Sequence, residues 1–157
     1  MMKTLKTYKQ LFENFDKISV DILMINASDW DYIERWLKEG GDINVKSYDG
    51  WSLLTLNTNN NYFFIVKDLL DLGADPNIQN GYGNTSLMLA KDTDMIKLLI
   101  DNNADWNITN NDGEDFVDLL DPHIDPWSGN TENWLSKEYP EKYQDYLRKK
   151  KANEFNL

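Results

Sequence analysis

The sequence contains no cysteine, and this absence removes several chemistries at once. Disulfide bonds, zinc–thiolate centres and cysteine nucleophiles all need a thiol. Histidine occurs once, as His123, which excludes a histidine-rich metal site and leaves at most one general base of this type. Neither a phosphate-cradling glycine motif nor a GxSxG nucleophile turn occurs. We therefore expect a protein that is not an enzyme and that binds no cofactor and no metal.

Long hydrophobic runs are missing as well. No stretch approaches the roughly 18 apolar residues that a membrane-spanning helix needs. The continuous apolar segment of a signal peptide is absent from the start of the chain, which reads MMKTLKTYKQLFENFDK. We therefore expect no membrane contact and a cytoplasmic location, either in the source cell or, for an effector, in a host cell.

Positive charge is scarce in this chain of 157 residues. Against 27 Asp and Glu there are 16 Lys and Arg, which gives a formal net charge of -11. Such a field repels phosphate backbones and anionic lipids and accelerates encounter with basic partners. We expect no nucleic-acid ligand but a basic protein partner, bound by a chain that is otherwise a monomer. The alternative is that the charge only keeps the protein soluble.

What the chain does contain is a repeated segment. The sequence DLGADPNIQN at 71–80 returns as DNNADWNITN at 101–110, and KEGGDINVKS at 38–47 is an earlier copy. Because missing a repeat leads to the wrong fold, this pattern takes precedence over other signals. Two sets of landmarks keep one register, spaced by 33 and then 30 residues: Gly50, Gly83 and Gly113, and Asn44, Asn77 and Asn107.

Each unit has the pattern of two helices followed by a polar loop. Apolar residues at 65, 66, 69 and 70 share one helical face. Gly73 suits the left-handed position that ends the second helix, and Asn103 is the next best residue there. Ser52 and Thr85 precede the first helices, where a hydroxyl can cap free amides. Since no unit can bury its own apolar face, we expect the units to stack.

In these features the chain resembles the ankyrin repeat family. The family consensus, roughly DGxTPLHLAA…GHxxIVxLLLxxGADVN, is similar to residues 49–77 and, after the shorter turn, to residues 83–107. The TPLH tetrapeptide is replaced by SLLT at 52–55 and by TSLM at 85–88, which predicts looser repeats. The resemblance implies an all-α solenoid of stacked helix-turn-helix pairs with protruding loops. It also implies a non-catalytic module for protein–protein interaction.

The repeat register predicts the domain organisation. We expect the repeat array over residues 1–122, with units of about 19–47, 48–80, 81–110 and 111–122. Residues 1–18 are expected to form an N-terminal capping helix, because Tyr8, Leu11, Phe12 and Phe15 have helical spacing. In the last unit a first helix is predicted from Asp115 to Leu120, stopped by Pro122.

Residues 123–157 differ in composition and form a C-terminal extension. A helix with Pro140 in its first turn is predicted over 138–152, with Trp127 and Trp134 in the connection before it. The basic run at 148–151 is interpreted as a solvated helix end. The helix is predicted from a stripe of large side chains at helical spacing, formed by Tyr139, Tyr143, Tyr146 and Leu147. This stripe either closes the last repeat, docks a partner or swaps between copies of the chain.

Ligands of ankyrin proteins bind the loop tips and the exposed face of each first helix. Large aromatics on loops dominate interface energies, so Trp51 is expected to be the centre of a site that is aromatic in the middle and acidic around it. Transferred by position, the expected tip residues are Tyr48, Asp49, Trp51, Tyr82, Asn84, Asp112 and Glu114. The expected residues of first helices and turns are Thr55, Asn59, Asn60, Met88 and Lys91.

Three functions are compatible with this pattern. The leading one is a protein that binds and masks a basic partner such as a toxin or nuclease, in the manner of an immunity protein. The second is an effector or adaptor that recruits host or cellular machinery through its C-terminal helix. The third is a metal-dependent enzyme that uses Asp121, His123 and Asp125, although the two prolines around this segment favour a structural loop. The polar run at 105–115 is not a calcium loop, because its acidic pattern places neither glycine at position six nor glutamate at position twelve.

Overall fold

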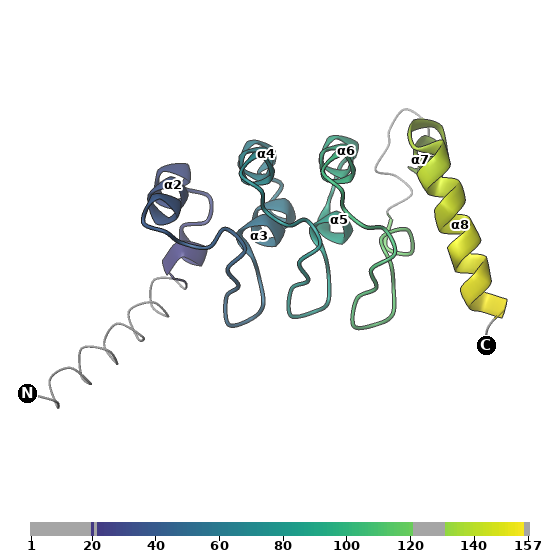
Figure 1. Ribbon diagram of the computed structural model, residues 1–157, viewed down its shortest axis with the longest axis horizontal. Helices are drawn as coiled ribbons and strands as arrows, with labels where there is room; N and C mark the ends of the chain where they lie inside the picture. The colour runs from purple at the N-terminus through teal and green to yellow at the C-terminus, as the bar shows by residue number, and fades with distance from the viewer. Residues whose placement is uncertain (1–19, 21, 121–130, 156–157) are drawn as a thin grey trace, which may run out of the picture.

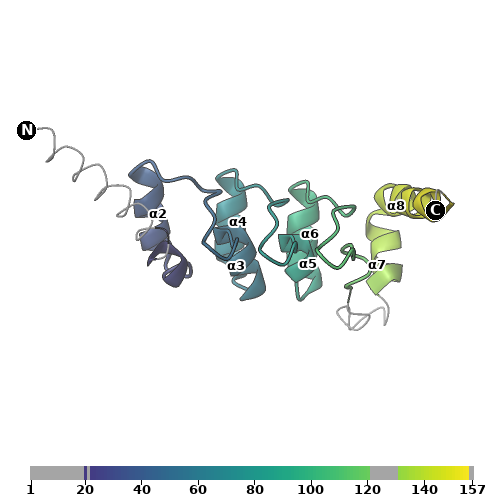
Figure 2. The same ribbon diagram turned by 90° about the horizontal axis from the view of Figure 1, so that it is seen from below.

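The computed structural model describes residues 20, 22–120 and 131–155, and in it helix pairs follow one another in single file (Figures 1 and 2). Outer helices form one row and shorter inner helices lie beneath them (Figure 1). The predicted all-α ankyrin-type solenoid is confirmed. After helical residues 22–25, the elements are α2 (Trp30–Lys38), α3 (Leu53–Asn59), α4 (Phe63–Asp71), α5 (Ser86–Leu89), α6 (Thr93–Asp101), α7 (Thr131–Glu138) and α8 (Pro140–Phe155).

Helix starts follow the capping rules in most units. The Ser52 hydroxyl accepts a hydrogen bond from the Thr55 amide at 3.1 Å, and the Thr55 hydroxyl accepts one from the Ser52 amide at 2.9 Å. Thr85 occupies the N-cap position of α5, but its side chain forms no capping bond, so that part of the prediction is wrong. The second helix of the same unit, α6, does have a capping bond. Its N-cap residue is Asp92, whose carboxylate accepts a hydrogen bond from the Met95 amide.

Helix ends confirm the predicted left-handed residues. Gly73 follows α4 with φ 89°, and Asn103 follows α6 with φ 67°. In this conformation the chain turns back sharply, and the amides of Ala74 and Ala104 reach the carbonyls of Leu69 and Leu99 at 3.0 Å. Each outer helix therefore leads directly into the loop that carries the repeated Asp and Asn residues.

The core runs through the stack from one unit to the next. Helix α3 packs against both α4 and α5, so the apolar side of one unit is covered by the next. Full burial of a leucine or isoleucine contributes about 1.5 to 3 kcal/mol. The largest fully buried side chains in this part of the chain are Leu53, Leu54, Val66, Leu69, Leu87, Met95, Ile96, Leu99 and Ile100.

The repeated asparagines connect consecutive loops. Asn44 accepts a hydrogen bond from the Asp75 amide at 2.9 Å, and Asn77 accepts one from the Asp105 amide at 2.8 Å. The two bonds join residues 31 and 28 positions apart. The near-identical segments therefore recur because each supplies an acceptor for the following unit.

The hairpin tips are joined in the same manner, through the backbone. The Gly81 amide donates to the Asp49 carbonyl at 3.0 Å, and the Asn111 amide donates to the Tyr82 carbonyl at 3.1 Å. Gly50 has φ 81°, and a Cβ on it would lie 2.7 Å from the Gly81 nitrogen. Glycine is required here both for the conformation and for the close approach.

An aromatic cluster closes the C-terminal end of the stack. Trp106 is 4% exposed, and its ring lies 6.0 Å from Phe116, 6.1 Å from Tyr139 and 6.5 Å from Tyr146. Leu135 of α7 is fully buried in the same core. Of the alternatives for the aromatic stripe, the structure therefore supports closure of the last repeat. Trp106 stands where the preceding loop has Pro76.

Several predicted boundaries near this end are wrong. Residues 115–120 form no helix but a single turn at 116–119, in which the Asp115 carboxylate accepts hydrogen bonds from the amides of Val117 and Asp118. The helix predicted over 138–152 is part of two helices that break at Tyr139. Pro140 opens α8 as predicted, but Trp134 lies within α7 and not in the connection.

Some predictions fall outside the described residues. These are the capping helix at 1–18, Trp127, and the Asp121, His123 and Asp125 segment. Among the residues that are described, no group of three potential ligands could hold a metal ion. None of the described helices has the length and hydropathy to cross a membrane.

Candidate protein-binding surface

Two tyrosines stand exposed on neighbouring hairpin tips. Tyr48 is 90% exposed and Tyr82 is 68% exposed, and among the described large hydrophobic side chains only Ile25 and Phe64 have exposures between these two values. The hydrogen bond between Gly81 and Asp49 holds their tips together. The tips project away from the row of outer helices (Figure 1). The structure thus presents both rings at one edge of the stack.

Acidic residues flank the tyrosines on the same tips. Asp49 adjoins Tyr48, while Asp112 and Glu114 belong to the next tip after Tyr82, and all three are exposed. We call this set the tip ridge: Tyr48, Asp49, Tyr82, Asp112 and Glu114. The ridge is aromatic in its first two tips and acidic in its last.

A polar residue three positions before the tip glycine shapes each hairpin. Asn80 accepts hydrogen bonds from the amides of Tyr82 at 2.9 Å and Asn84 at 3.0 Å. Asn110 accepts from Asp112 and Glu114, both at 3.0 Å, and Ser47 accepts from Trp51 at 3.0 Å. Side chains of this type stabilise turns through such bonds. Ser47, Asn80 and Asn110 were not among the predicted site residues, although their constant offset from Gly50, Gly83 and Gly113 is a usable signal.

The same asparagine also links one tip to the next. The Asn110 amide group donates to the Asn84 side-chain oxygen at 3.2 Å and to a Glu114 carboxylate oxygen at 3.1 Å. Asn84 and Glu114, both predicted as site residues, are therefore brought together. Because these bonds exist before any partner arrives, the ridge needs little ordering on binding.

Trp51 is less exposed than the sequence suggests. Its side chain is half-buried, and its carbonyl accepts from the Ser47 amide at 2.8 Å across the hairpin. The adjoining residues Lys46 and Ser52 form an isolated β-bridge. Trp51 therefore lies on the second arm of the hairpin, below the exposed tyrosine, and contributes an edge of the surface.

The predicted residues of the first helices divide into two groups. Thr55 is fully buried in the cap of α3 and Met88 packs against the core, so neither of them forms an open surface. Asn59, Asn60 and Lys91 lie at the turns, where the Lys91 ammonium group donates to the Asn59 carbonyl. This contact joins the turns of two consecutive units.

The C-terminal basic run at 148–151 is exposed as predicted except at Lys150, but it does not end the helix. Helix α8 continues to Phe155, beyond the run. Lys150 forms an ion pair with Asp118 and lies 5.5 Å from the centre of the Tyr146 ring. Its hydrogen bond lowers the pKa of Asp118. Lys149 pairs with Asp145 at 2.9 Å. The run thus contributes to the aromatic cluster that closes the C-terminal end of the stack, which we call the aromatic cap.

The tyrosines of the cap have altered acidity. Burial raises the pKa of Tyr146 to about 12 and that of Tyr139 to about 12. Tyr146 donates to the Asp115 carboxylate at 3.0 Å, and Tyr139 donates to Asp101 at 3.0 Å. A neutral phenol can donate these bonds and a phenolate cannot, so the cap is built for the protonated form.

Comparison with known proteins identifies the repeat. A family model described as ankyrin repeats, in three copies, matches residues 23–110, which is more than half of the chain. This chain belongs to the ankyrin repeat family. An ankyrin repeat protein of Acanthamoeba polyphaga mimivirus is 32% identical, in an alignment that covers 59% of this chain and 21% of the viral protein. The ankyrin chain thus corresponds to about a fifth of that relative.

The family assignment defines the general activity. Ankyrin repeats form protein–protein interaction modules, and this ankyrin chain is one of them. The resemblance stated from the sequence is therefore confirmed. The matched region contains the tips at 48–50 and 81–83 but ends before the last tip at 111–113 and before α7 and α8.

Proposed function

We propose that this ankyrin chain binds a basic protein through the tip ridge and masks the surface that it covers. The observation that carries the proposal is the exposure of Tyr48 and Tyr82, at 90% and 68%, on hydrogen-bonded neighbouring tips. Exposed aromatic side chains with no packing role are typical of interaction sites.

The charge of the ridge favours a cationic partner. Asp49, Asp112 and Glu114 are exposed beside the two tyrosine rings, in a chain with a net charge of -11. Negative potential over such a surface accelerates the approach of a basic protein and disfavours acidic ones. Tyrosine rings then supply the contact energy, with about 2 kcal/mol for a central residue.

Masking of the partner requires only contact and no catalytic step. A partner held on the ridge is covered where it contacts the tips, so a toxin or nuclease bound by its basic active surface is inhibited. This is the activity of an immunity-type inhibitor, and it needs neither a cofactor nor a metal. The adaptor function through the C-terminal helix is less favoured, since Tyr146 is 4% exposed and belongs to the cap.

Affinity capture with matched tyrosine variants tests the proposal. Full-length protein, Tyr48→Ala with Tyr82→Ala, and Tyr62→Ala are immobilised and exposed to extract from the source cells. Tyr62 is the control because it is 44% exposed but lies at the start of α4, away from the tips. We expect a basic protein retained by the wild type and by Tyr62→Ala and released by salt.

The double variant is expected to lose that protein, since loss of about 2 kcal/mol weakens binding roughly 30-fold. The proposal is overturned if the double variant retains the same proteins as the wild type. It is also overturned if Tyr62→Ala loses them equally, because the contact is then not on the ridge. Circular dichroism spectra of all three proteins establish that each is folded.

A further inference from the structure

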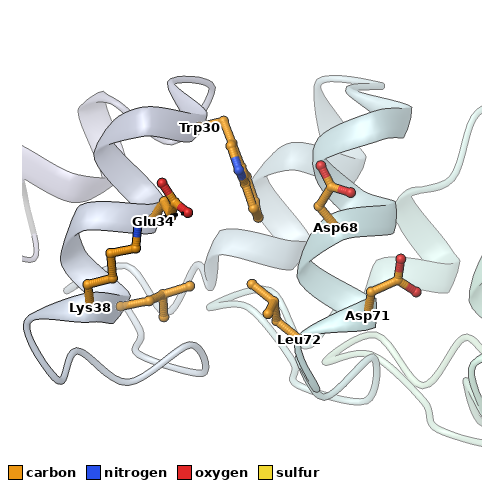
Figure 3. Close-up of a pocket in the computed structure, with 7 residues that line it drawn as sticks. Trp30, Glu34, Lys38, Asp68, Asp71 and Leu72 are labelled. Carbon is orange, nitrogen blue, oxygen red and sulfur yellow. Dashed lines mark ion pairs between the residues drawn. The ribbon is translucent and has the colours of Figure 1, made fainter.

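A cleft opens on the outer face of the stack, on the side opposite to the tip ridge. It lies between α2 and α4 and encloses about 510 Å³. Figure 3 shows the Trp30 ring and the Leu72 side chain projecting into the space between the two helices. The residues that line the cleft are Trp30, Glu34, Leu37, Lys38, Asp68, Asp71 and Leu72.

The α4 side presents two exposed apolar residues, one that lines the cleft and one beyond it. Leu72 lines the cleft and is 55% exposed, and Phe64, two turns before it and outside the lining, is 79% exposed. In the following unit, 30 residues further on, the equivalent positions hold Asp94 and Asn102. Since polar residues satisfy the repeat at these positions, the exposed ring and the exposed leucine call for another explanation.

One carboxylate of the cleft forms no ion pair among the described residues. Glu34 is paired with Lys38 at 2.9 Å, and Asp71 is paired with Lys67 at 2.7 Å. Asp68 lies on the wall formed by α4, and its charge helps to raise the pKa of Lys67 without forming a hydrogen bond or ion pair with a described residue. The cleft thus combines an apolar surface with a carboxylate that can accept a further cation.

We propose that this cleft is a second docking site, for an amphipathic helix of a partner protein that carries a lysine or arginine beside its apolar stripe. The apolar side chains of that helix enter between Trp30 and Leu72 and cover Phe64, as in other helix-in-groove contacts. Its cation pairs with Asp68. Charge complementarity and the spacing of Phe64, Asp68 and Leu72 by one helical turn both favour this occupant.

The two surfaces lie on opposite edges of the stack, with the tips on one side and the outer helices on the other (Figure 1). A protein on the tip ridge and a helix in the cleft can therefore be held together. The consequence is a bridging activity, which goes beyond masking and is independent of it.

A titration with designed peptides tests the cleft. The probe is a capped 16-residue helical peptide of Leu, Lys, Ala and Gln, with leucines at i, i+4 and i+8 and lysines next to that stripe. Two matched peptides carry glutamate for each lysine or serine for each leucine. Binding to the full chain is followed by amide NMR shifts. We expect the first peptide to bind with shifts confined to α2 and α4, at least 10-fold more tightly than either matched peptide.

Charge-matched protein variants locate the contact. Asp68→Lys and Asp94→Lys change the net charge equally, but only the first alters the cleft, since Asp94 is an exposed residue of α6 outside both the cleft and the tip ridge. We expect Asp68→Lys to weaken binding at least 5-fold and Asp94→Lys to leave it within 2-fold. Phe64→Ser is expected to weaken binding 5-fold or more. Asp68→Lys and Phe64→Ser change no residue of the tip ridge. If they do not weaken peptide binding, the cleft proposal fails while the tip-ridge proposal still stands, so the two proposals are distinguishable.

Three results would overturn the docking site. The first is equal binding of the lysine and glutamate peptides. The second is equal weakening by Asp68→Lys and Asp94→Lys, which means attraction to the overall charge. The third is a shift of α2 and α4 signals with protein concentration alone, which means that a second copy of the chain occupies the cleft.

Discussion

The interior of the stack and its C-terminal end are held together by different chemistry. Between units, the same bonds recur at the same positions, from Asn44 and Asn77 to the following loop and from each tip to the next. At the end, the Asn107 side chain donates to Asp105 of its own loop at 2.7 Å. Contact there is made by the Trp106 cluster instead.

This difference shows what a repeat can encode. A bond that every unit makes with the next is written into every unit, so it appears as periodic sequence. A contact made once has no period. The cap depends on large side chains such as Trp106 and Leu135, each of which occurs at only one position in the register.

The largest expected effect of a single substitution is at the end of the stack. Trp106→Ala removes a 4% exposed ring that contacts three aromatic residues, and we expect a loss of about 3 to 5 kcal/mol in the free energy of unfolding. Urea denaturation followed by circular dichroism measures it. Trp51→Ala is the control, because that ring is only half-buried.

A similar loss for both tryptophan variants would contradict the assignment of Trp106 as the centre of the cap. The distinction between interior and end would also fail if Trp106→Ala left the α7 and α8 amides protected from hydrogen exchange. We expect these amides to exchange much faster in the variant, while those of α4 keep their protection.

Two tip glycines compare the interior and the end directly. Gly83 and Gly113 have φ values of 81° and 82°, so alanine is strained equally at both. A Cβ on Gly83 would lie 2.5 Å from the Asn111 nitrogen, whereas one on Gly113 has nothing within 4 Å. We expect Gly83→Ala to cost more than about 2 kcal/mol and Gly113→Ala about 1 kcal/mol.

Thermal unfolding of the two alanine variants under identical conditions measures this difference. The conformational strain cancels between them, so the difference reports the close approach of one tip to the next. Equal midpoints would mean that the tips do not depend on one another.

The smallest expected effect concerns alkaline pH and is confined to the end. The pKa of Tyr146 is raised to about 12 in the folded chain, above its ordinary value of about 10. The folded state therefore keeps its proton longer than the unfolded state, and stability falls as pH rises between these two values. We expect a loss of about 1 kcal/mol from Tyr146 by about pH 11.

Denaturation midpoints at neutral pH and at about pH 11 test this expectation. Tyr146→Phe keeps the ring but cannot ionise, so its stability is expected to depend less on alkaline pH than that of the wild type. The cause is not Tyr146 if both proteins lose the same stability over this interval.

The interior was predictable from the sequence to a large extent. The positions of Gly73 and Asn103, the Ser52 cap and the order of helices follow from local conformational preferences that a repeat states twice. Thr85 was misjudged because its hydroxyl is buried without a bond. The residues of the tip ridge were predicted from their positions in the ankyrin repeat. The exposure of each aromatic ring depends on neighbouring side chains in the fold, which the spacing of residues in the sequence does not reveal.

The end of the chain resisted prediction for a physical reason. Residues 115–120 have helical spacing but form only one turn, and the Asp115 carboxylate at its start also accepts the Tyr146 hydroxyl from 31 residues away. A partner so distant in sequence leaves no local pattern. The same holds for Lys150, whose charge looks solvated until Asp118 is placed beside it.

By itself, the sequence determined that helix pairs stack in register, because each unit carries an apolar face and an asparagine acceptor that only a neighbour can use. Only the tertiary structure decided which side chains remain in solvent. Exposure is a property of packing between units, and it left the two tip tyrosines and the α2–α4 cleft open while it closed the aromatic cap.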